Sequence, residues 1–306
     1  MDISCLPFLA AASNGRQPQP DEYRNEADGF LYCKHCHTRR ERFLELPGLT
    51  LRVQMLCACQ TAKRDQEEQA EQIRRQREQI SRNRNLGLPD PEHRKHCFAN
   101  DLGYHPILTR AAKNYVDNWE QFYREGTGLL IWGQVGSGKS FLAGCIANAL
   151  LDRGVRVMMT NFSRLLNRLS DLRFSERNPM IDELVRYPLL IIDDLGIERN
   201  SDYAKEQVFS IIDSRYRSGL PIIITTNLTP QEMADTPDLA KRRIYNRILE
   251  RCCPMEVNQQ NIRNLHALQA HRQTKAILSR ERNAPATQAS QAAAVKGDLG
   301  YRLSQA

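Results

Sequence analysis

The sequence predicts an α/β fold built around a five-stranded parallel sheet, and three observations lead to that fold class. Residues 133–140 match the phosphate-loop pattern G-x-x-x-x-G-K-[S/T], with an apolar, strand-like run before them and a helical pattern after them. Strand-like and helix-like patterns then alternate, as in sheets with parallel strands. Two of the strand-like runs end in polar side chains, at the edge where such sheets bind ligands. The expected strands are residues 128–132, 155–160, 188–194, 220–227 and 254–257.

The phosphate loop predicts a nucleotide site. Its glycines allow a tight turn that aims successive backbone N–H groups, and the positive end of the next helix, at phosphate oxygens. We expect Lys139 to reach the outer phosphates and the Ser140 hydroxyl to help hold Mg²⁺. A chance match in a glycine-rich turn is the alternative, and the flanking patterns argue against it. The residues expected to bind the nucleotide are Gly133, Gln134, Val135, Gly136, Ser137, Gly138, Lys139, Ser140, Phe141 and Asp193.

Two strand ends supply further candidates. Four apolar residues followed by Asp193 form the Walker B pattern, so we expect Asp193 to hold Mg²⁺ through its water shell, together with Ser140. Asp194 is expected to orient or deprotonate the attacking water as general base. Asn227 is expected to position that water or to sense the γ-phosphate. The alternative for the two aspartates is a polar strand end that caps the next helix.

Four of the nine cysteines form two close pairs, Cys33-x-x-Cys36 and Cys57-x-Cys59, with twenty residues between the pairs. Two thiolate pairs on separate turns supply the four tetrahedral ligands of a closed structural Zn²⁺ site. The two histidines beside Cys36 offer substitute ligands, although we expect them to be exposed. Reduced cysteines without a metal are the remaining alternative.

Composition restricts the partners and the compartment. The chain has 306 residues, a net charge of +7 and a pI of about 9.0, which favours an anionic partner such as nucleic acid. No apolar run approaches the roughly 18 residues that a membrane span needs. The first ten residues are apolar but carry an acid where a signal peptide has Lys or Arg. We therefore expect a cytoplasmic protein without membrane contact, and no disulfide framework.

Four motifs in order resemble one family: the phosphate loop, residues 191–196 (IIDDLG), 223–227 (IITTN) and 243–248 (RIYNRI). Together they resemble the AAA+ ATPases of the DnaC/IstB-like group, which contains bacterial and phage helicase loaders and transposition helper ATPases. The resemblance covers about residues 95–258 and implies an AAA+ P-loop NTPase fold with helices flanking the sheet. It also makes Phe98 a candidate adenine contact.

Membership of this group implies that an arginine of one subunit completes the ATP site of the next, within an oligomer or spiral. Arg247 is our choice from its position in the last motif, and Arg243 is the alternative; a solvated basic helix face would explain both. AAA+ proteins usually carry Glu after the Walker B Asp. Asp194 is one methylene shorter, so we expect slow ATP hydrolysis.

The helical stretch after the second strand carries interleaved arginines and aromatic residues. This pattern suits single-stranded DNA, because cations follow the phosphates while rings stack on bases. The alternative is an amphipathic helix with its leucines packed inward and its arginines in water. The expected DNA contacts are Arg164, Arg168 and Arg173.

The charged stretch 61–84 is expected to be a solvated linker helix, because a coiled coil needs two apolar positions per heptad and this stretch has one. An oligomerisation or nucleic-acid helix is the alternative. The expected segments are a disordered tail (1–29), a zinc-binding module (30–62), the helical linker (63–92), the AAA+ ATPase domain (93–260) and a basic helix with a low-complexity tail (261–306).

The resemblance and the cysteine pairs together lead to one expected function. We expect an ATP-dependent DNA replication protein, a DnaC-like loader that binds a DnaB-type replicative helicase and single-stranded DNA. The cysteine-paired N-terminal module is similar to that of many phage and Gram-positive loaders. An IstB-like transposition helper is the nearest alternative. A small-molecule P-loop kinase and a zinc-anchored DNA-binding regulator with a vestigial ATP site are more distant ones.

Overall fold

Two compact units divide the chain, Met1–Gln79 and Ile80–Ala306. In the computed structural model the described residues are 17–196, 201–257 and five isolated positions after residue 270. The first sixteen residues of the expected tail lie outside the described residues. So does the basic helix and low-complexity tail expected over 261–306, apart from the isolated positions.

Two antiparallel strand pairs form the N-terminal unit. They are β1 (Glu22–Arg24) with β2 (Leu31–Cys33), and β3 (Glu41–Leu46) with β4 (Leu49–Gln54). Arg40 is 2% exposed, and its guanidinium pairs with the carboxylates of Asp21 at 2.7 Å and Glu22 at 3.1 Å. β1 therefore lies inside the stretch that the sequence assigned to a disordered tail, because the buried ion pair between Arg40 and Glu22 holds it against the rest of the unit.

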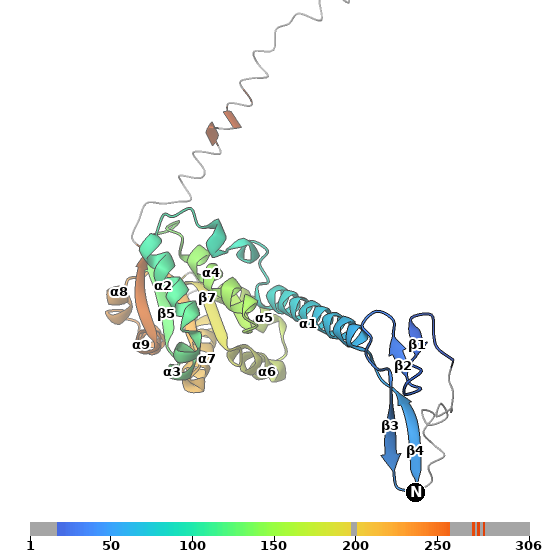
Figure 1. The fold of residues 1–306 in the computed structure, drawn as a ribbon. Coiled ribbons are helices and arrows are strands. Elements are labelled where there is room, and N and C mark those ends of the chain that lie inside the picture. The colour runs from blue at the N-terminus through green and yellow to red at the C-terminus, as the bar shows by residue number, and fades with distance from the viewer. Residues whose placement is uncertain (1–16, 197–200, 258–270, 273, 276–277, 279–306) are drawn as a thin grey trace, which may run out of the picture. The chain divides into compact units, whose positions relative to one another are not determined.

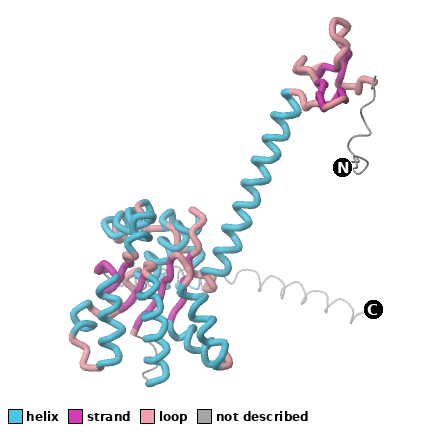
Figure 2. The backbone as a smooth tube through the Cα atoms, turned by 90° about the horizontal axis from the view of Figure 1, so that it is seen from below, coloured by secondary structure: helices cyan, strands magenta, loops and turns pink. Residues whose placement is uncertain are grey.

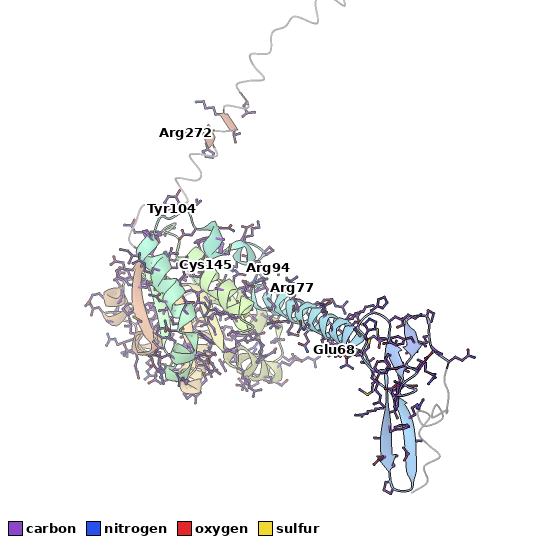
Figure 3. All side chains as sticks on the ribbon, viewed as in Figure 1. Glu68, Arg77, Arg94, Tyr104, Cys145 and Arg272 are labelled. Carbon is purple, nitrogen blue, oxygen red and sulfur yellow. The ribbon has the colours of Figure 1, made fainter. Side chains whose placement is uncertain are left out.

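α1 (Ala58–Gly87) contains the charged stretch 61–84 that the sequence predicts to be helical, but the helix begins between Cys57 and Cys59 and not after the second cysteine pair. Pairs such as Arg64 with Glu68, four residues apart, support a helix that has almost no apolar face. Glu68 and Arg77 project from it in Figure 3. Within the described part of the chain, no helix combines the length and the apolar character that crossing a membrane requires.

The last turn of α1 is packed within the second unit. A Cβ at Gly87 would lie 1.9 Å from the carbonyl oxygen of Val157, so only glycine allows this approach. The next residue, Leu88, is fully buried in the core. Arg94, labelled in Figure 3, donates from Nε to the carbonyl oxygen of Leu88 at 2.7 Å. These contacts fix the chain where it enters the α/β fold.

The second unit contains the predicted five-stranded parallel sheet, which confirms that part of the expected fold. The strand order is β6-β7-β8-β5-β9, and every neighbouring pair is parallel. The carboxyl ends of β5, β7 and β8 consequently meet at one edge of the sheet. The strands are β5 (Gly128–Gly133), β6 (Val157–Asn161), β7 (Leu189–Leu195), β8 (Ile222–Thr226) and β9 (Cys252–Val257).

Helices cover both faces of the sheet (Figures 1 and 2). The helices are α2 (Pro106–Asp117), α3 (Trp119–Glu125), α4 (Lys139–Asp152), α5 (Phe162–Asp171), α6 (Phe174–Val185), α7 (Asp202–Ser218), α8 (Pro230–Ala234) and α9 (Leu239–Arg251), with short 3₁₀ turns η3 (His93–Lys95) and η4 (Phe98–Asn100). Alternate strand residues face opposite sides. Leu129 and Ile131 therefore pack with α2, α3 and α4, whereas Leu130 packs with the helices from α5 to α9.

β7 bulges where its two carboxylates begin. The register between β7 and β8 shifts between Ile192 and Leu195. Asp193 has a buried side chain, whereas Asp194 is exposed and adopts φ +58°, in the left-handed region that few non-glycine residues occupy. The bulge thus places two adjacent carboxylates in different surroundings.

Candidate nucleotide-binding site

The phosphate loop joins β5 to α4 in a conformation that depends on glycine. Gly136 and Gly138 have φ values of +78° and +101°, which residues with side chains rarely adopt. A Cβ at Gly133 would lie 2.3 Å from the carbonyl oxygen of Val257 on β9. The loop therefore requires glycine at all three positions for conformation, since Gly133 has φ +146°, and at Gly133 also for space.

Lys139 begins α4 and is 5% exposed. Its ammonium donates to the carbonyl oxygens of Gly133 at 3.0 Å and Gln134 at 2.8 Å, and to Oδ1 of Asn227 at 2.8 Å. Asn227 directly follows β8. The structure thus brings together the loop lysine and the strand-end amide that the sequence assigned to one site, and a bound phosphate must compete with these oxygen acceptors.

Asp193 lies at the end of β7 and is 7% exposed. Its Oδ1 accepts a hydrogen bond from the Thr225 hydroxyl at 2.6 Å, and the same hydroxyl oxygen accepts one from the Asp194 backbone N–H at 2.9 Å. Oδ2 of Asp193 lies 3.9 Å from Nε2 of His93, beyond hydrogen-bond distance. Thr225 therefore orients one oxygen of the carboxylate and links it to the bulge.

The donors at this edge fit a hydrated Mg²⁺. This ion takes oxygen ligands, keeps several waters and is usually bound through one or two protein groups plus phosphates. Asp193 offers a carboxylate with one oxygen already oriented by Thr225, and Ser140 offers a half-buried hydroxyl in the first turn of α4. A loaded ion would neutralise charge on the phosphates.

Two histidines from the segment before α2 also face this edge. Their rings lie 5.5 Å apart, and the ring of His96 lies 5.3 Å from that of Phe141 on α4. Asn148, on the same helix, donates to the carbonyl oxygens of His93 and His96, both at 2.8 Å. Burial lowers the pKa of His96 below its usual range. Gly144 leaves the space that the His96 ring occupies.

A cavity of about 270 Å³ adjoins the phosphate loop. Its largely apolar walls include Tyr104 (Figure 3), His105, Phe141 and Val257, and such a lining suits a flat base. Phe98, the candidate adenine contact, is not among the lining residues; it packs against the core instead. Residues that follow Phe98 in the sequence, such as Tyr104 and His105, line the cavity instead.

A family model described as IstB-like ATP binding protein matches residues 48–270 of the chain. The chain belongs to this family. The sequence-based resemblance to the DnaC/IstB-like group is thereby confirmed, together with ATP binding as the property that the family name states.

Relatives of the IstB-like chain include proteins of two kinds. The replicative helicase loader DnaI of Bacillus subtilis is 26% identical over 167 residues, which cover 49% of this chain and 53% of DnaI. An insertion-sequence ATP-binding protein of Sinorhizobium fredii is 28% identical over 170 residues, 55% of this chain and 57% of that protein. The chain thus spans about half the length of the curated relatives it matches. The crystal structure of the DnaC helicase loader has 25% identity and a TM-score of 0.49, covering 55% of this chain and 100% of that chain.

The two arginine-finger candidates of the IstB-like chain lie on α9 in different surroundings. Nε and Nη2 of Arg247 both lie 2.8 Å from Oδ1 of Asp213 on α7, and its guanidinium lies 4.8 Å from the ring centroid of Phe209. Arg243 is exposed, lines a cavity of about 260 Å³ beside α7, and has no side-chain partner among the described residues. Arg247 is thus held within its own subunit, whereas Arg243 is available for contact.

The four thiols grouped by the sequence lie together, with all sulfur atoms within 4.8 Å of one another. Sγ of Cys59 lies 3.6 Å from that of Cys33 and 3.1 Å from that of Cys57, and none of the four forms a disulfide. A hydrogen bond with Thr38 lowers the pKa of Cys36 to about 5, whereas contact with Cys57 raises that of Cys59 to about 12. Zinc–sulfur bonds of about 2.3 Å place tetrahedral sulfurs about 3.8 Å apart, so the cluster fits Zn²⁺.

The proposed DNA-contact arginines are divided between two places. Arg164 and Arg168 are exposed on α5 and line a cavity of about 330 Å³ beside the edge strand β6. Arg173 is exposed just before α6 and does not line that cavity. Leu165 and Leu169 are buried, so the inward-facing leucine stripe is also present. On α5 the two predictions are therefore compatible, since the leucines pack inward while the arginines remain exposed for contact with DNA.

Sequence reasoning missed three residues that the structure brings to the site. Thr225 lies within the recognised IITTN run but had no assigned role. His93 precedes the phosphate loop by forty residues, and the only sequence feature that pointed to this segment was His96, three residues later. Nε2 of His105 lies 2.8 Å from the carbonyl oxygen of Ser137, a contact between two loops that no motif spacing indicates.

Proposed function

We propose that this chain is an ATP-dependent replication protein that loads a DnaB-type replicative helicase onto single-stranded DNA. The observation that carries the choice of loader is the cluster of four thiols in the N-terminal unit, ahead of an assembled phosphate-loop site. Similarity to the helicase loader DnaI supports it. In this proposal the N-terminal unit binds the helicase and the ATPase unit binds DNA.

ATP hydrolysis in this proposal is slow and acts as a switch. Lys139 and the loop N–H groups bind the phosphates, and Ser140 with Asp193 holds Mg²⁺. Asp194 would act as the general base that orients or deprotonates water. Its exposure and its position on a bulge, together with its short side chain, support weak rather than fast hydrolysis.

A subunit of this protein is proposed to complete its neighbour's site within an oligomer or spiral. Arg247 remains our candidate for the arginine finger by its place in the RIYNRI motif, and Arg243 is the alternative that its exposure favours. Arg247 can contact a neighbouring subunit in two ways. Its ion pair with Asp213 opens, or its guanidinium binds through the N–H groups that Asp213 does not hold. Zinc is proposed to bind the cysteine cluster and hold the helicase-binding unit together.

The second candidate is a transposition helper ATPase. The family description and the similarity to an insertion-sequence ATP-binding protein favour it. Both candidates share the nucleotide site, so ATP binding alone does not separate them. Their partners differ: a DnaB-type replicative helicase in one case and a transposase in the other.

Helicase capture followed by loading is the experiment that separates the candidates. The full chain is mixed with a DnaB-type helicase from the same genome, and strand separation is measured on DNA coated with single-strand binding protein. We expect capture by the unaltered chain, loss of loading with Lys139→Ala, and loss of capture with Cys33→Ser plus Cys36→Ser. Failure to capture the helicase, combined with stimulation of a transposase, would establish the transposition role instead.

A further inference from the structure

His93 reaches the metal-holding edge of the site from outside the four motifs. It lies on η3, its side chain is 15% exposed, and its Nε2 lies 3.9 Å from Oδ2 of Asp193. Its other ring nitrogen, Nδ1, is buried and finds no hydrogen-bond partner in the described part of the chain. Buried N–H groups without an acceptor are rarer than unpaired acceptors. The ring proton therefore belongs on Nε2, the nitrogen that faces the carboxylate.

Among the residues that the structure describes, only one oxygen of Asp193 has a donor. Oδ1 accepts from Thr225 at 2.6 Å, whereas none of these residues places a donor within hydrogen-bond distance of Oδ2. A carboxylate held at one oxygen alone still rotates about its side-chain bonds. A second donor at Oδ2 would define the direction in which Asp193 presents its charge. The ring of His93 is the group in place for this role.

The backbone of His93 is fixed to the helix that begins at Lys139. Asn148 on that helix donates to the carbonyl oxygen of His93 at 2.8 Å, and its own Oδ1 accepts from Nε of Arg84 at 3.1 Å. Arg84 lies in the last turn of α1. Because the backbone is held, only the ring of His93 has to move. A shift of about 1 Å closes the 3.9 Å between Nε2 and Oδ2 of Asp193 to the ~3 Å of a charge-assisted hydrogen bond.

We propose that His93 is a positioning residue for the metal site, donating from Nε2 to Oδ2 of Asp193 so that this carboxylate is oriented for Mg²⁺ when the nucleotide binds. The inference rests on the proposed ATP site. His93 makes no contact with the reacting phosphates in this scheme and acts through Asp193 alone. Partners in the outer shell of a metal site typically alter metal affinity about 10–100-fold when they are removed.

Nucleotide affinity as a function of Mg²⁺ tests the proposal without relying on hydrolysis. The full chain is titrated with N-methylanthraniloyl-ATP in EDTA and then at increasing Mg²⁺. His93→Phe keeps a ring of similar shape and removes the donor, and His93→Gln restores an N–H. We expect His93→Phe to raise the half-saturating Mg²⁺ concentration about tenfold while its affinity in EDTA stays within about twofold of the unaltered chain. His93→Gln should return within about threefold of that chain.

Lys95→Gln, at an exposed side chain on the same 3₁₀ turn, is the matched control and should leave the Mg²⁺ dependence unchanged. Equal Mg²⁺ dependence in all variants would overturn the proposal. So would a loss of affinity in EDTA that matches the loss in Mg²⁺, because this indicates a packing role. If His93→Phe unfolds, His93→Leu takes its place in the comparison. An unaltered chain that binds no ATP analogue would instead refute the proposed function.

Discussion

The ammonium of Lys139 donates a hydrogen bond to the side-chain oxygen of Asn227, with 2.8 Å between Nζ and Oδ1. This contact links the phosphate loop to the end of β8, so Asn227 can respond to the group that Lys139 binds. We expect Asn227→Ala to lower ATP hydrolysis at least about tenfold, in the range of one lost polar catalytic contact, and to leave the nucleotide Kd within about threefold. Asn227→Asp should instead weaken binding, because its carboxylate competes with phosphate for Lys139. Equal loss of affinity in both variants would contradict this assignment.

Subunit mixing tests the shared ATP site. Arg247→Ala should lower hydrolysis about a thousandfold, as removal of an arginine finger does, with ATP binding within a few-fold. Mixing this variant with Lys139→Ala should restore part of the activity, since each supplies what the other lacks. Asp213→Asn, which removes the ion-pair partner of Arg247, is the control and should remain active. Activity that is lost in Arg243→Ala and retained in Arg247→Ala would assign the finger to Arg243.

Metal analysis checks the cysteine cluster. The purified protein should contain about one zinc per chain, because four thiols form one tetrahedral site. Cys33→Ser plus Cys36→Ser, or a strong chelator, should remove the metal and open the N-terminal unit to proteolysis. Cys253→Ser is the matched control, since this exposed cysteine lies outside the cluster and its loss should not change the zinc content. A metal-free protein with a protease-resistant N-terminal unit would reject the zinc site.

Salt dependence measures the DNA contacts on α5. Replacing Arg164 and Arg168 by Ala should weaken binding of single-stranded DNA and reduce the slope of log affinity against log salt by about 1.4, since each phosphate contact on a single strand contributes about 0.7. Arg110→Ala, at an exposed arginine on α2, should leave the slope unchanged. The measurement is fluorescence anisotropy with a labelled oligonucleotide. An unchanged slope in the double variant would exclude this face of α5 as the DNA site.

Gly144 is predicted to be essential for the packing of His96 on α4. A Cβ at Gly144 would lie 2.6 Å from Nδ1 of His96, so Gly144→Ala should lower the free energy of unfolding by about 1–2 kcal/mol, the cost of overpacking. In a His96→Ala background the same change should raise it by up to about 1 kcal/mol, because only the better helix propensity of Ala remains. Urea denaturation followed by circular dichroism measures both values. A shift of the same sign in both backgrounds would contradict the packing assignment.

The parallel sheet and the central site were predictable because their information is local. Each buried strand appears as a short apolar run, and the loop glycines are needed wherever φ is positive. Asp193 lies near the carboxyl end of β7 and Asn227 directly follows β8, so the parallel topology brings both to the edge where Lys139 lies. The bulge that separates Asp193 from Asp194 was not predictable, since it arises from pairing with β8.

Contacts between distant segments were the part that sequence reasoning missed. β1 has three residues, too few for a periodic signal, and it is held by the buried ion pair between Arg40 and Glu22. Arg215 resembled any other basic helix residue. It is instead 1% exposed and donates to the carbonyl oxygens of Val185, Tyr187, Pro188 and Pro221, and burial lowers its pKa to about 9. Such a residue is recognisable only once the carbonyls around it are in place.

The buried end of α1 has a practical consequence for dividing the protein into parts. A shortened chain that starts at the expected domain boundary, residue 93, would keep every phosphate-loop and Walker B residue. It would lack Leu88 from the core and the Arg84 donor that holds Asn148. In such a fragment we expect α4 to be less firmly packed and His93 to be displaced. A low ATPase activity of the fragment would then be attributed wrongly to the loss of the cysteine-containing unit. A chain that starts at residue 80 avoids this confusion.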